Sequence, residues 1–599
     1  MGARKTRRHR KQEGAETQPP APVVESRADP RGAAERYLPA WVWMLPSLVL
    51  GALVYARTVA FGFSFLDDAF LTEKQSLTNL GGVGRAFETV YVLGTYYRPL
   101  VTASYVLDSK WSGSNAASYH ATNVLLHLAT IALVYVLLIR LRFPRWISAF
   151  TSSAFAIHPA LVEAVAWIPG RNDSLFTVFA LGSWIFLTFD IERESPSFSS
   201  PASLRSGLRQ PPGVSSAPSL RSGLRPNLLR LGHVAGLLAA LFTKETALVL
   251  PLLFAVYVWS TGLASSWLRT KRLWPWWVLD LAGYAAARAA VGAPHEVSGK
   301  TASTLLANVP VLLAGLGKLC LPLQLSPLAT ARDAAVWPGF IAIAAIAAAV
   351  VAIRPLRRNV LFLAASTFLL PLLPTLFVAE RLTLENRLYL PAVGLCIFLA
   401  ELAAASSPGR RPLLAAVGAC VLAAFVPVTW TYVSAFQDRQ TLARAAVDSS
   451  PSSALAHLQR GDAYYTIQHD LDQAEGEYRQ AIDIDSRELV VHNNLAVVLM
   501  ARSRFSEAEV ELRKELEMNA RYAAAHYNLG IVLRKTGRPD DAAIEWERAL
   551  QSEPNHVNAM GELLVYHSAR GEQAKADYYR DQMSKRGMTF VAPLSGQGR

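Results

Sequence analysis

Ionisable residues recur beside long apolar segments of this sequence, in types that suit acid–base chemistry and anion binding. They include carboxylates, imidazoles, guanidinium groups and a lysine, at Asp67, Asp68, Arg98, His120, His158, Glu163, Arg171, Asp173, Lys244, Glu245, Glu385 and Arg387. A charge at the centre of a bilayer costs about 2.5–3.5 kcal/mol even on insertion scales, so such residues normally face protein or water and mark a functional path.

The adjacent carboxylates Asp67 and Asp68 follow the first apolar segment directly, within Phe63-Ser-Phe-Leu-Asp-Asp-Ala-Phe70. Paired carboxylates raise one another's pKa, which suits a general base near neutral pH. The alternative is a pair that only solvates a loop. A divalent cation at this pair also stays open, although the sequence shows neither a closed set of metal ligands nor a Gly-rich phosphate loop.

Two further pairs of charges differ in how they can be neutralised. Lys244 and Glu245 are adjacent, and adjacent helical residues diverge by about 100°, so each is expected to find a different partner. Arg381 and Glu385 are four residues apart, a spacing that allows them to pair on one face of a helix.

The elements that must position these residues are apolar runs of the length that spans a bilayer. We expect about eleven such helices. They are predicted at 41–60, 120–140, 146–165, 173–190, 230–245, 246–262, 275–293, 337–354, 360–378, 388–404 and 412–431.

The distribution of basic residues predicts which way these helices run. Arg and Lys are concentrated before the first predicted span and in alternate short loops, as at Arg140, Arg142, Arg357 and Arg410, so the N-terminus is expected to be cytoplasmic. An odd number of spans then places the C-terminal region outside, and the ionisable residues cluster at that outer side around a polar cavity. The same loops account for the net charge of +13 without nucleic acid as a partner.

Beyond residue 432 the pattern changes to paired short amphipathic helices. Ala474, Ala508, Ala542 and Ala576 recur at 34-residue intervals, the length of a tetratricopeptide unit. We expect three repeats and a partial fourth, with Gly530 allowing two helices to approach closely and one extra residue near His469-Asp470. Such a domain either binds an extended peptide or partner protein, or packs on its neighbours.

The sequence therefore predicts an all-α chain, a polytopic transmembrane bundle followed by a tetratricopeptide-repeat solenoid. The expected parts are a disordered basic cytoplasmic tail (1–36), the transmembrane domain (37–432), the repeat domain (433–585) and a C-terminal tail (586–599). A Ser/Pro/Gly-rich stretch at 192–228 contains a duplicated heptapeptide and is expected to be a flexible cytoplasmic loop.

Several strings resemble the transmembrane and tetratricopeptide-repeat protein O-mannosyltransferases and their bacterial relatives, in the C-type glycosyltransferase superfamily. The resemblance covers about 60–580. It rests on Leu66-Asp-Asp68, Tyr97-Arg-Pro-Leu100, Tyr119-His-Ala-Thr-Asn123 with His127, His158-Pro-Ala-Leu-Val-Glu-Ala-Val165, Gly170-Arg-Asn-Asp173, Thr243-Lys-Glu-Thr246 and Glu385-Asn-Arg-Leu-Tyr-Leu-Pro391, followed by the repeats.

The resemblance implies transfer of a monosaccharide from a polyprenyl-phosphate donor to a hydroxyl acceptor on the non-cytoplasmic side. By motif position, the base is Asp68 or Asp67. The implied ligands of the donor phosphate are Arg98, Arg171, Lys244 and Arg387, since cations stabilise the charge that accumulates on this leaving group. The residues that would orient them or shape the pocket are His120, His158, Glu163, Asp173, Glu245 and Glu385.

Two features separate the chain from the family pattern: the repeat array is short, and 192–228 resembles an insertion. The Ala- and Arg-rich sequence suggests a bacterial source, hence an inner membrane. The acceptor is then a protein, with Ser or Thr hydroxyls, a glycan or a lipid, and mannose is the first candidate sugar. The alternative function is a non-catalytic membrane scaffold whose outer repeats assemble an envelope complex.

Overall fold

The computed structural model describes residues 38–64, 81–88, 96–113, 115–194, 226–261, 266–292, 301–377, 385–488 and 490–585. These residues are helical apart from their connections and isolated bridge residues at Tyr96 and Thr330, which confirms the all-α fold. The tails, residues 195–225 of the predicted loop at 192–228, and Asp67, Asp68 and Arg381 lie outside the described residues.

Within the described chain, five helical segments are long and apolar enough to cross a membrane. They are Ala40–Ala60, Ala117–Arg140, Ile168–Glu192, Arg358–Phe377 and Pro408–Ser434. A sixth candidate joins Arg145–Ala156 to Pro159–Ala166 through a 61° bend. The bend falls at Pro159, whose nitrogen has no hydrogen to donate to the preceding turn.

Shorter apolar helices complete the bundle, at Asn227–Leu241, Glu245–Ser260, Thr304–Cys320, Trp337–Ala352 and Pro391–Ala405. The span predicted at 275–293 falls on α13 (Ser266–Ala290), which does not reach the same apolar criterion. Its sequence includes Lys271, Arg272, Asp280 and Arg288, which lower its hydropathy. Helix α14 (Thr301–Cys320) lies where no span was predicted.

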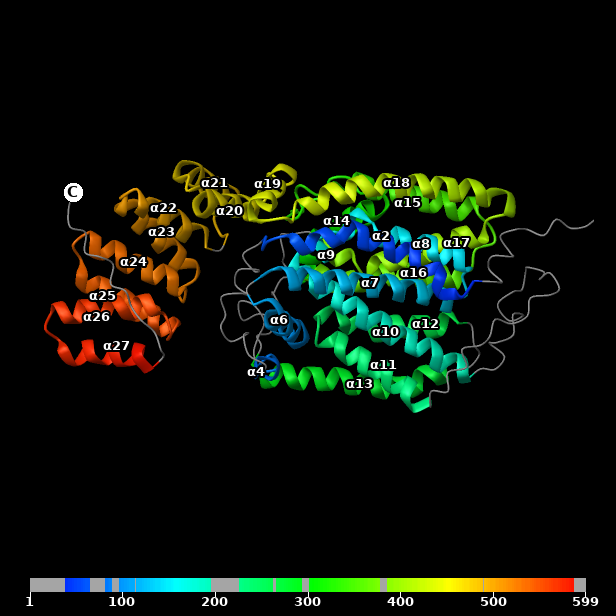
Figure 1. Cartoon of the computed structure of the whole chain (residues 1–599), viewed down its shortest axis with the longest axis horizontal. Helices are drawn as coiled ribbons and strands as arrows, with labels where there is room; N and C mark the ends of the chain where they lie inside the picture. The colour runs from blue at the N-terminus through cyan, green and yellow to red at the C-terminus, as the bar shows by residue number, and fades with distance from the viewer. Residues whose placement is uncertain are drawn as a thin grey trace, which may run out of the picture.

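The bundle has two distinct ends, as Figure 1 shows. At one end, Arg145 donates to the Leu38 carbonyl, Arg140 pairs with Glu192, and Arg357 pairs with Glu401. The chain leaves for the repeat domain at the other end, where α18 (Arg411–Ser434) is followed by α19 (Arg439–Ser449). The first described residue and the repeats therefore lie at opposite ends.

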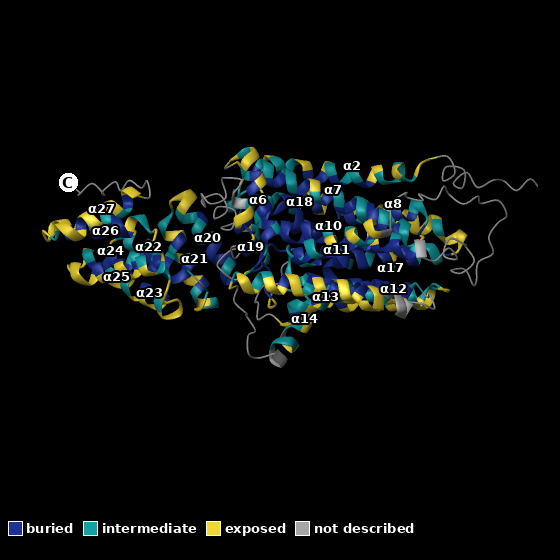
Figure 2. Cartoon of the chain, turned by 90° about the horizontal axis from the view of Figure 1, so that it is seen from below, coloured by how far each residue is buried: buried dark blue, intermediate teal, exposed yellow. Residues whose placement is uncertain are grey.

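The remaining bundle helices lie between these two ends. They are α2 (Leu45–Tyr55), α6 (Pro99–Ser112), α7 (Ala117–Arg140), α8 (Arg145–Ala156), α9 (Glu163–Ala166), α10 (Arg171–Glu194), α11 (Pro226–Leu241), α12 (Leu250–Ser260), α15 (Trp337–Ala352), α16 (Arg358–Leu369) and α17 (Pro391–Ala405). In the apolar window of Ile168–Glu192, 67% of residues are buried, against 11% for Pro408–Ser434. Helix α10 is thus central, within the interior that Figure 2 colours as buried, and α18 is peripheral, along the upper edge of the bundle in Figure 1.

Helix α14 makes its contacts at the repeat-side end. Asn308 donates to the carbonyls of Thr375 and Leu376, and Lys318 lies 2.7 Å from Glu385. The segment after α14 then joins the two domains, because Ser326 Oγ is 2.8 Å from Ser450 Oγ and Asp333 accepts a hydrogen bond of 2.6 Å from Ser452.

The repeat domain consists of stacked helix pairs. These are α20 (Ala454–Ala463) with α21 (Leu471–Ile484), α22 (Val491–Ala501) with α23 (Phe505–Met518), α24 (Ala523–Lys535) with α25 (Pro539–Ser552), and α26 (Val557–Ala569) with α27 (Gln573–Lys585). A Cβ on Gly530 would lie 2.3 Å from Trp546 Nε1, which explains glycine at this helix crossing. The extra residue of the first repeat is absorbed by a π-helical turn, Tyr464–Gln468, that ends at His469 with φ 56°.

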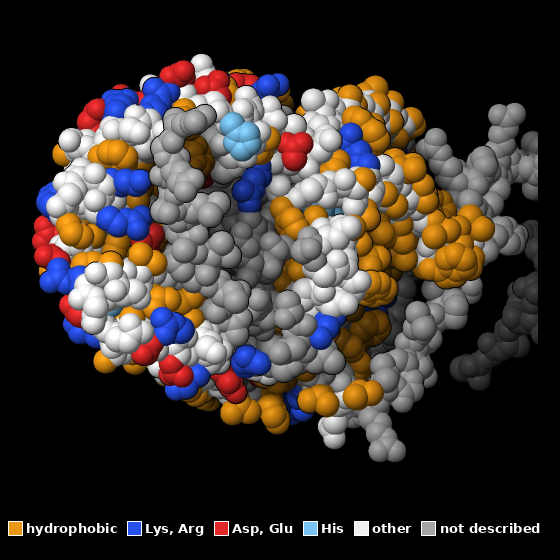
Figure 3. Space-filling view, turned by 60° about the vertical axis from the view of Figure 1, so that its left-hand side comes forward, with side chains coloured by type: hydrophobic (Ala, Val, Ile, Leu, Met, Phe, Trp, Pro, Cys, Tyr) orange, Lys and Arg blue, Asp and Glu red, His pale blue; other side chains and the backbone are white. Residues whose placement is uncertain are grey.

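The two domains present different surfaces. Figure 3 shows apolar side chains gathered over the bundle and intermixed acidic and basic side chains over the repeats. An exposed apolar belt is expected where lipid replaces water, and a mixed-charge surface is expected in water.

Candidate functional site

A cluster of opposite charges lies at the repeat-side end of the bundle. Lys244 Nζ is 2.6 Å from both carboxylate oxygens of Asp173, and Arg98 Nε donates to Glu245 Oε2 at 3.0 Å. Arg98 and Arg387 both lie close enough to Lys244 to repel its charge, and Arg387 also lies within the field of Asp173. The structure thus brings together three of the four predicted phosphate ligands.

Helix ends position this charge cluster. Arg98 immediately precedes α6, Lys244 lies in the turn between α11 and the 3-10 helix Glu245–Val249, and Asp173 is in the first turn of α10. The side chains of Lys244 and Glu245 diverge as expected from their adjacency. Lys244 reaches Asp173, whereas Glu245 reaches Arg98 and lies 3.8 Å from Arg288.

Arg171 occupies a different environment, fully buried beneath α6 and α7. Its guanidinium donates to Asn123 Oδ1 at 2.8 Å, Ser104 Oγ at 3.1 Å and the Tyr119 carbonyl at 2.6 Å. It also lies 2.5 Å from Asp108 Oδ2. These groups occupy the planar fork of the guanidinium, so Arg171 holds helices together where it stands.

The strings that carried the family resemblance contact one another. Asn123 Nδ2 donates to the Val165 and Trp167 carbonyls at 3.2 and 3.0 Å, which fastens α7 to the turn before α10. His127 Nδ1 lies 2.6 Å from the Tyr389 hydroxyl. Residues far apart in the sequence therefore form one connected polar framework.

The two predicted pocket histidines are enclosed in packing contacts. His158 Nε2 lies 2.8 Å from the Leu319 carbonyl, while its Nδ1 accepts from Ala160 N, so the ring is held as one neutral tautomer. His120 is also buried, with Nε2 3.2 Å from the Gly62 carbonyl. His158 therefore joins the bend to α14, and His120 joins the end of the first span to α7.

Glu163 and Glu385 form a second buried cluster beside the first. Glu385 accepts from Lys318 Nζ at 2.7 Å, from Ser326 N at 3.0 Å and from the Tyr432 hydroxyl at 3.0 Å. Sequence reasoning missed Lys318 and Tyr432. Lys318 could have been found as a lone lysine in an apolar run, whereas nothing in the sequence marks Tyr432.

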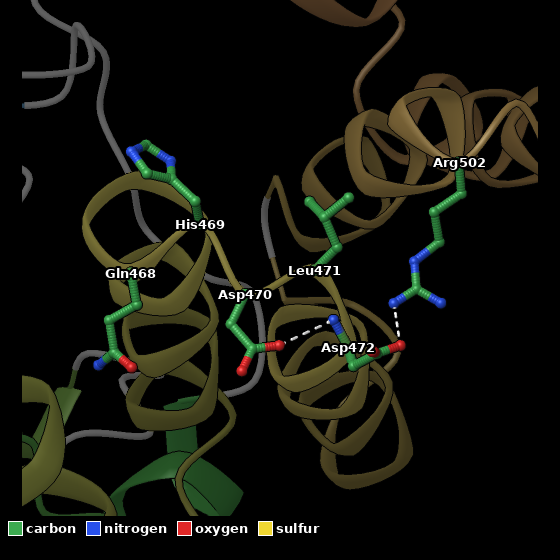
Figure 4. A pocket seen from close by; sticks show the side chains of 6 residues that line it. All are labelled: Gln468, His469, Asp470, Leu471, Asp472 and Arg502. Atoms are coloured by element: carbon green, nitrogen blue, oxygen red, sulfur yellow. Dashed lines mark hydrogen bonds and ion pairs between the residues drawn. The ribbon is translucent and has the colours of Figure 1, made fainter.

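A shallow pocket in the repeat domain lies apart from these clusters (Figure 4). It is lined by Gln468, His469, Asp470, Leu471, Asp472 and Arg502. Asp470 Oδ1 accepts from the backbone nitrogens of Asp472 and Gln473, and Arg502 pairs with Asp472. These polar groups satisfy one another, so the pocket follows from the turn of the first repeat.

The charge cluster is suited to binding an anion. Among the described residues, two carboxylates, Asp173 and Glu245, are accompanied by more cations, namely Arg98, Lys244, Arg288 and Arg387, which leaves an excess of positive charge. Within the ranges that the structure describes, no group of three His, Cys, Asp or Glu residues could hold a metal ion.

In comparisons with known proteins, the repeat domain matches a family model, whereas curated relatives match only short stretches of the chain. Residues 439–488 and 493–580 match the family described as "Tetratricopeptide repeat", which confirms the repeats. A solved structure titled "Crystal structure of PilW, widely conserved type IV pilus biogenesis factor" is 25% identical, with a TM-score of 0.24, and covers 29% of this chain and 77% of that one.

Curated relatives have names that fall within the expected class. The chain is 36% identical over 92 residues to "Protein O-mannosyl-transferase F38B6.6" of Caenorhabditis elegans, covering 15% of this chain and 13% of the relative. It is 33% identical over 152 residues to "Protein O-mannosyl-transferase TMTC2" of Mus musculus, covering 24% and 18%. The chain thus spans less than a fifth of the length of each of these relatives.

Proposed function

We propose that this protein is a membrane glycosyltransferase that moves a monosaccharide, mannose as first candidate, from a polyprenyl-phosphate donor to a hydroxyl acceptor. The observation that carries the proposal is the positive excess of Arg98, Lys244 and Arg387 at the repeat-side end of the bundle. The names of the partial relatives, all protein O-mannosyl-transferases, support the same class.

The chemistry needs fixed positive charge more than a nucleotide-binding fold. When the sugar leaves a lipid phosphate, negative charge accumulates on that phosphate, and preorganised cations lower the barrier by stabilising it. Lys244 and Arg98 are held by Asp173 and Glu245, so they do not have to be reorganised during transfer. Arg171 acts indirectly, by fixing α6, which follows Arg98, to α10, which carries the Asp173 partner of Lys244.

A base must also remove the proton of the acceptor hydroxyl. We assign this role to Asp68, with Asp67 as the second candidate, by their position after the first span. The described end of that span supports the placement, because the Gly62 carbonyl contacts His120 and Gly62 N donates to the Gln437 carbonyl at the repeat-side end.

The repeat domain lies at the same end as the charge cluster, where it is suited to presenting an acceptor protein. We place the protein in a bacterial inner membrane, with this end on the non-cytoplasmic side. Arg140, Arg142 and Arg357 lie at the opposite end, which supports this orientation by the positive-inside rule.

The direct test is to incubate the purified full chain with polyprenyl-phosphate mannose and a set of Ser- and Thr-containing acceptor peptides. We expect a product heavier by one hexose in mass spectrometry, lost when Lys244 is replaced by Ala. Absence of transfer with mannose and with other polyprenyl-phosphate sugars, to peptide, glycan and lipid acceptors alike, would contradict the proposal.

A further inference from the structure

Among the described residues of the bundle, Glu163 is a fully buried carboxyl group without an ion pair of its own. It begins α9, is 0% exposed, and accepts hydrogen bonds from the backbone of Glu385 and Asn386, of which the bond from Asn386 N to Oε2 is 2.9 Å long. Its other oxygen, Oε1, has no hydrogen-bond partner among the described residues. An ionised carboxylate in this state loses its hydration without compensation.

The cations near Glu163 are engaged elsewhere. Lys318 lies 2.7 Å from Glu385, which also accepts from Ser326 N and Tyr432. Arg387 lies within the field of Asp173 more strongly than within that of Glu163. Two neighbouring carboxyl groups thus share one lysine, and Glu385 receives the donors that favour an anion. In such a pair, one group binds a proton.

A second orphaned oxygen lies on the residue that Glu163 already contacts. Asn386 is 5% exposed, and its Oδ1 likewise has no donor in the part of the chain that the structure describes. The cluster therefore has more buried acceptors than donors, and a proton on Glu163 supplies a donor.

We propose that Glu163 is held as a neutral carboxylic acid and serves as the positioning residue for the Glu385–Leu388 turn that carries Arg387. The backbone of Glu163 is itself packed closely against Gly170, where an added Cβ would lie 2.2 Å from the Glu163 carbonyl oxygen. A neutral Glu163 also preserves the positive excess beside Arg387, which an ionised one would reduce; this consequence rests on the proposed function.

Glu401 provides a matched control, because it is a second buried glutamate with the opposite environment. It is 2% exposed, and its oxygens accept hydrogen bonds from Arg357 N, Nε and Nη2 at 2.7, 2.8 and 2.6 Å. Such a carboxylate is stabilised as an anion. The two residues thus differ in countercharge at similar burial.

Infrared spectroscopy of the full chain in detergent separates the carbonyl band of a protonated acid from carboxylate bands. We expect Glu163→Gln to remove a protonated-acid band and to keep the melting temperature, since the amide is neutral and retains an acceptor oxygen. Glu401→Gln should leave that band in place and lower the melting temperature. No band loss in Glu163→Gln, or a melting temperature lowered more by Glu163→Gln than by Glu401→Gln, would overturn the proposal.

Donor kinetics test the positioning role separately. Glu163→Ala removes the acceptor of Asn386 N and should raise the KM for the donor about tenfold, with a smaller change in kcat, because one hydrogen bond that orients the turn is lost. An unchanged KM in a folded, active variant would refute positioning. A complete lack of transfer activity in the unaltered protein would count against the proposed function alone, since the infrared result does not depend on activity.

Discussion

Ion pairs in the membrane bundle join residues far apart in the sequence, whereas those in the repeats join residues within a helix pair or in the next one. Lys244 and Asp173 are 71 residues apart, and Arg98 and Glu245 are 147 apart. In the repeats, Glu475 pairs with Arg504 and Glu509 with Arg538, each 29 residues apart.

The difference concerns both burial and redundancy. Arg171 is fully buried and its partners come from two other helices, α6 and α7, so its contacts cannot be rebuilt locally. Repeat-domain pairs recur from unit to unit at partly exposed positions, such as Arg513 with Glu509. We therefore expect the loss of a single buried charge in the bundle to cost more stability than the loss of a partly exposed charge in the repeats.

The largest effect is expected on catalysis, from replacements of the bundle's site residues. If Asp68 or Asp67 is the base, its replacement by Asn should lower turnover by about 10²–10⁴-fold while donor binding survives. Replacement of a cation should weaken donor binding as well as turnover, as in Arg98→Ala, Lys244→Ala and Arg387→Ala. Steady-state kinetics with the lipid donor distinguish these classes, and full transfer activity in both Asn variants would rule out the assigned base.

Removing one buried cation should show the next largest effect. Arg171→Ala leaves Asp108 buried without its partner, and breaking a buried pair in this way costs about 3–5 kcal/mol. Arg513→Ala removes a pair in the repeats whose arginine is 54% exposed, and should cost less than about 1 kcal/mol. Thermal unfolding of the full chain measures both, and equal losses would contradict the comparison.

Packing, rather than charge, should dominate in the repeats. Gly530→Ala places a Cβ against the Trp546 ring and should destabilise the domain by about 1–3 kcal/mol. Gly476→Ala, where no described atom lies within 4 Å of the added Cβ, should stabilise α21 by about 0.5–1 kcal/mol. Helix content followed during denaturant unfolding reports both, and a loss in Gly476→Ala as large as in Gly530→Ala would exclude this packing argument.

The smallest expected effect is the pH dependence of the repeat domain. Burial alone would lower the pKa of His492 and His526, but hydrogen bonds to Glu511 and Glu545 raise each above its ordinary 6.5. The stability from these pairs is complete below pH 6.5 and is lost as the pH rises through the raised pKa values. Burial alone would raise the pKa of Glu511, but His492 and Lys514 hold it below 4.5, so its contribution is lost as the pH falls.

His492→Gln and His526→Gln should flatten the alkaline side of this profile. Melting temperatures measured from pH 4.5 to pH 9 would show it, and an unchanged slope in the double variant would mean that these pairs do not couple to folding.

Much of the helical framework was predictable because its signals are local. The 34-residue recurrence of Ala474, Ala508 and Ala542 reflects helix pairs that contact only their neighbours, so sequence spacing and spatial spacing coincide. Apolar runs likewise predicted most bundle helices, because a helix satisfies its own backbone wherever it lies. Helix α14 was not predicted, since its sequence carries Pro310 and Lys318 and its contacts lie at the repeat-side end.

The candidate site was predictable in its residue types but not in its pairing. The sequence by itself determined that cations and carboxylates would gather near one end, and that Lys244 and Glu245 would diverge. Only the tertiary structure decided that Arg171 binds Asp108 and Asn123, and that Lys318 belongs to Glu385. The physical reason is distance along the chain: these partners meet only after several helices have packed, and local spacing carries no information about which buried charge will face which.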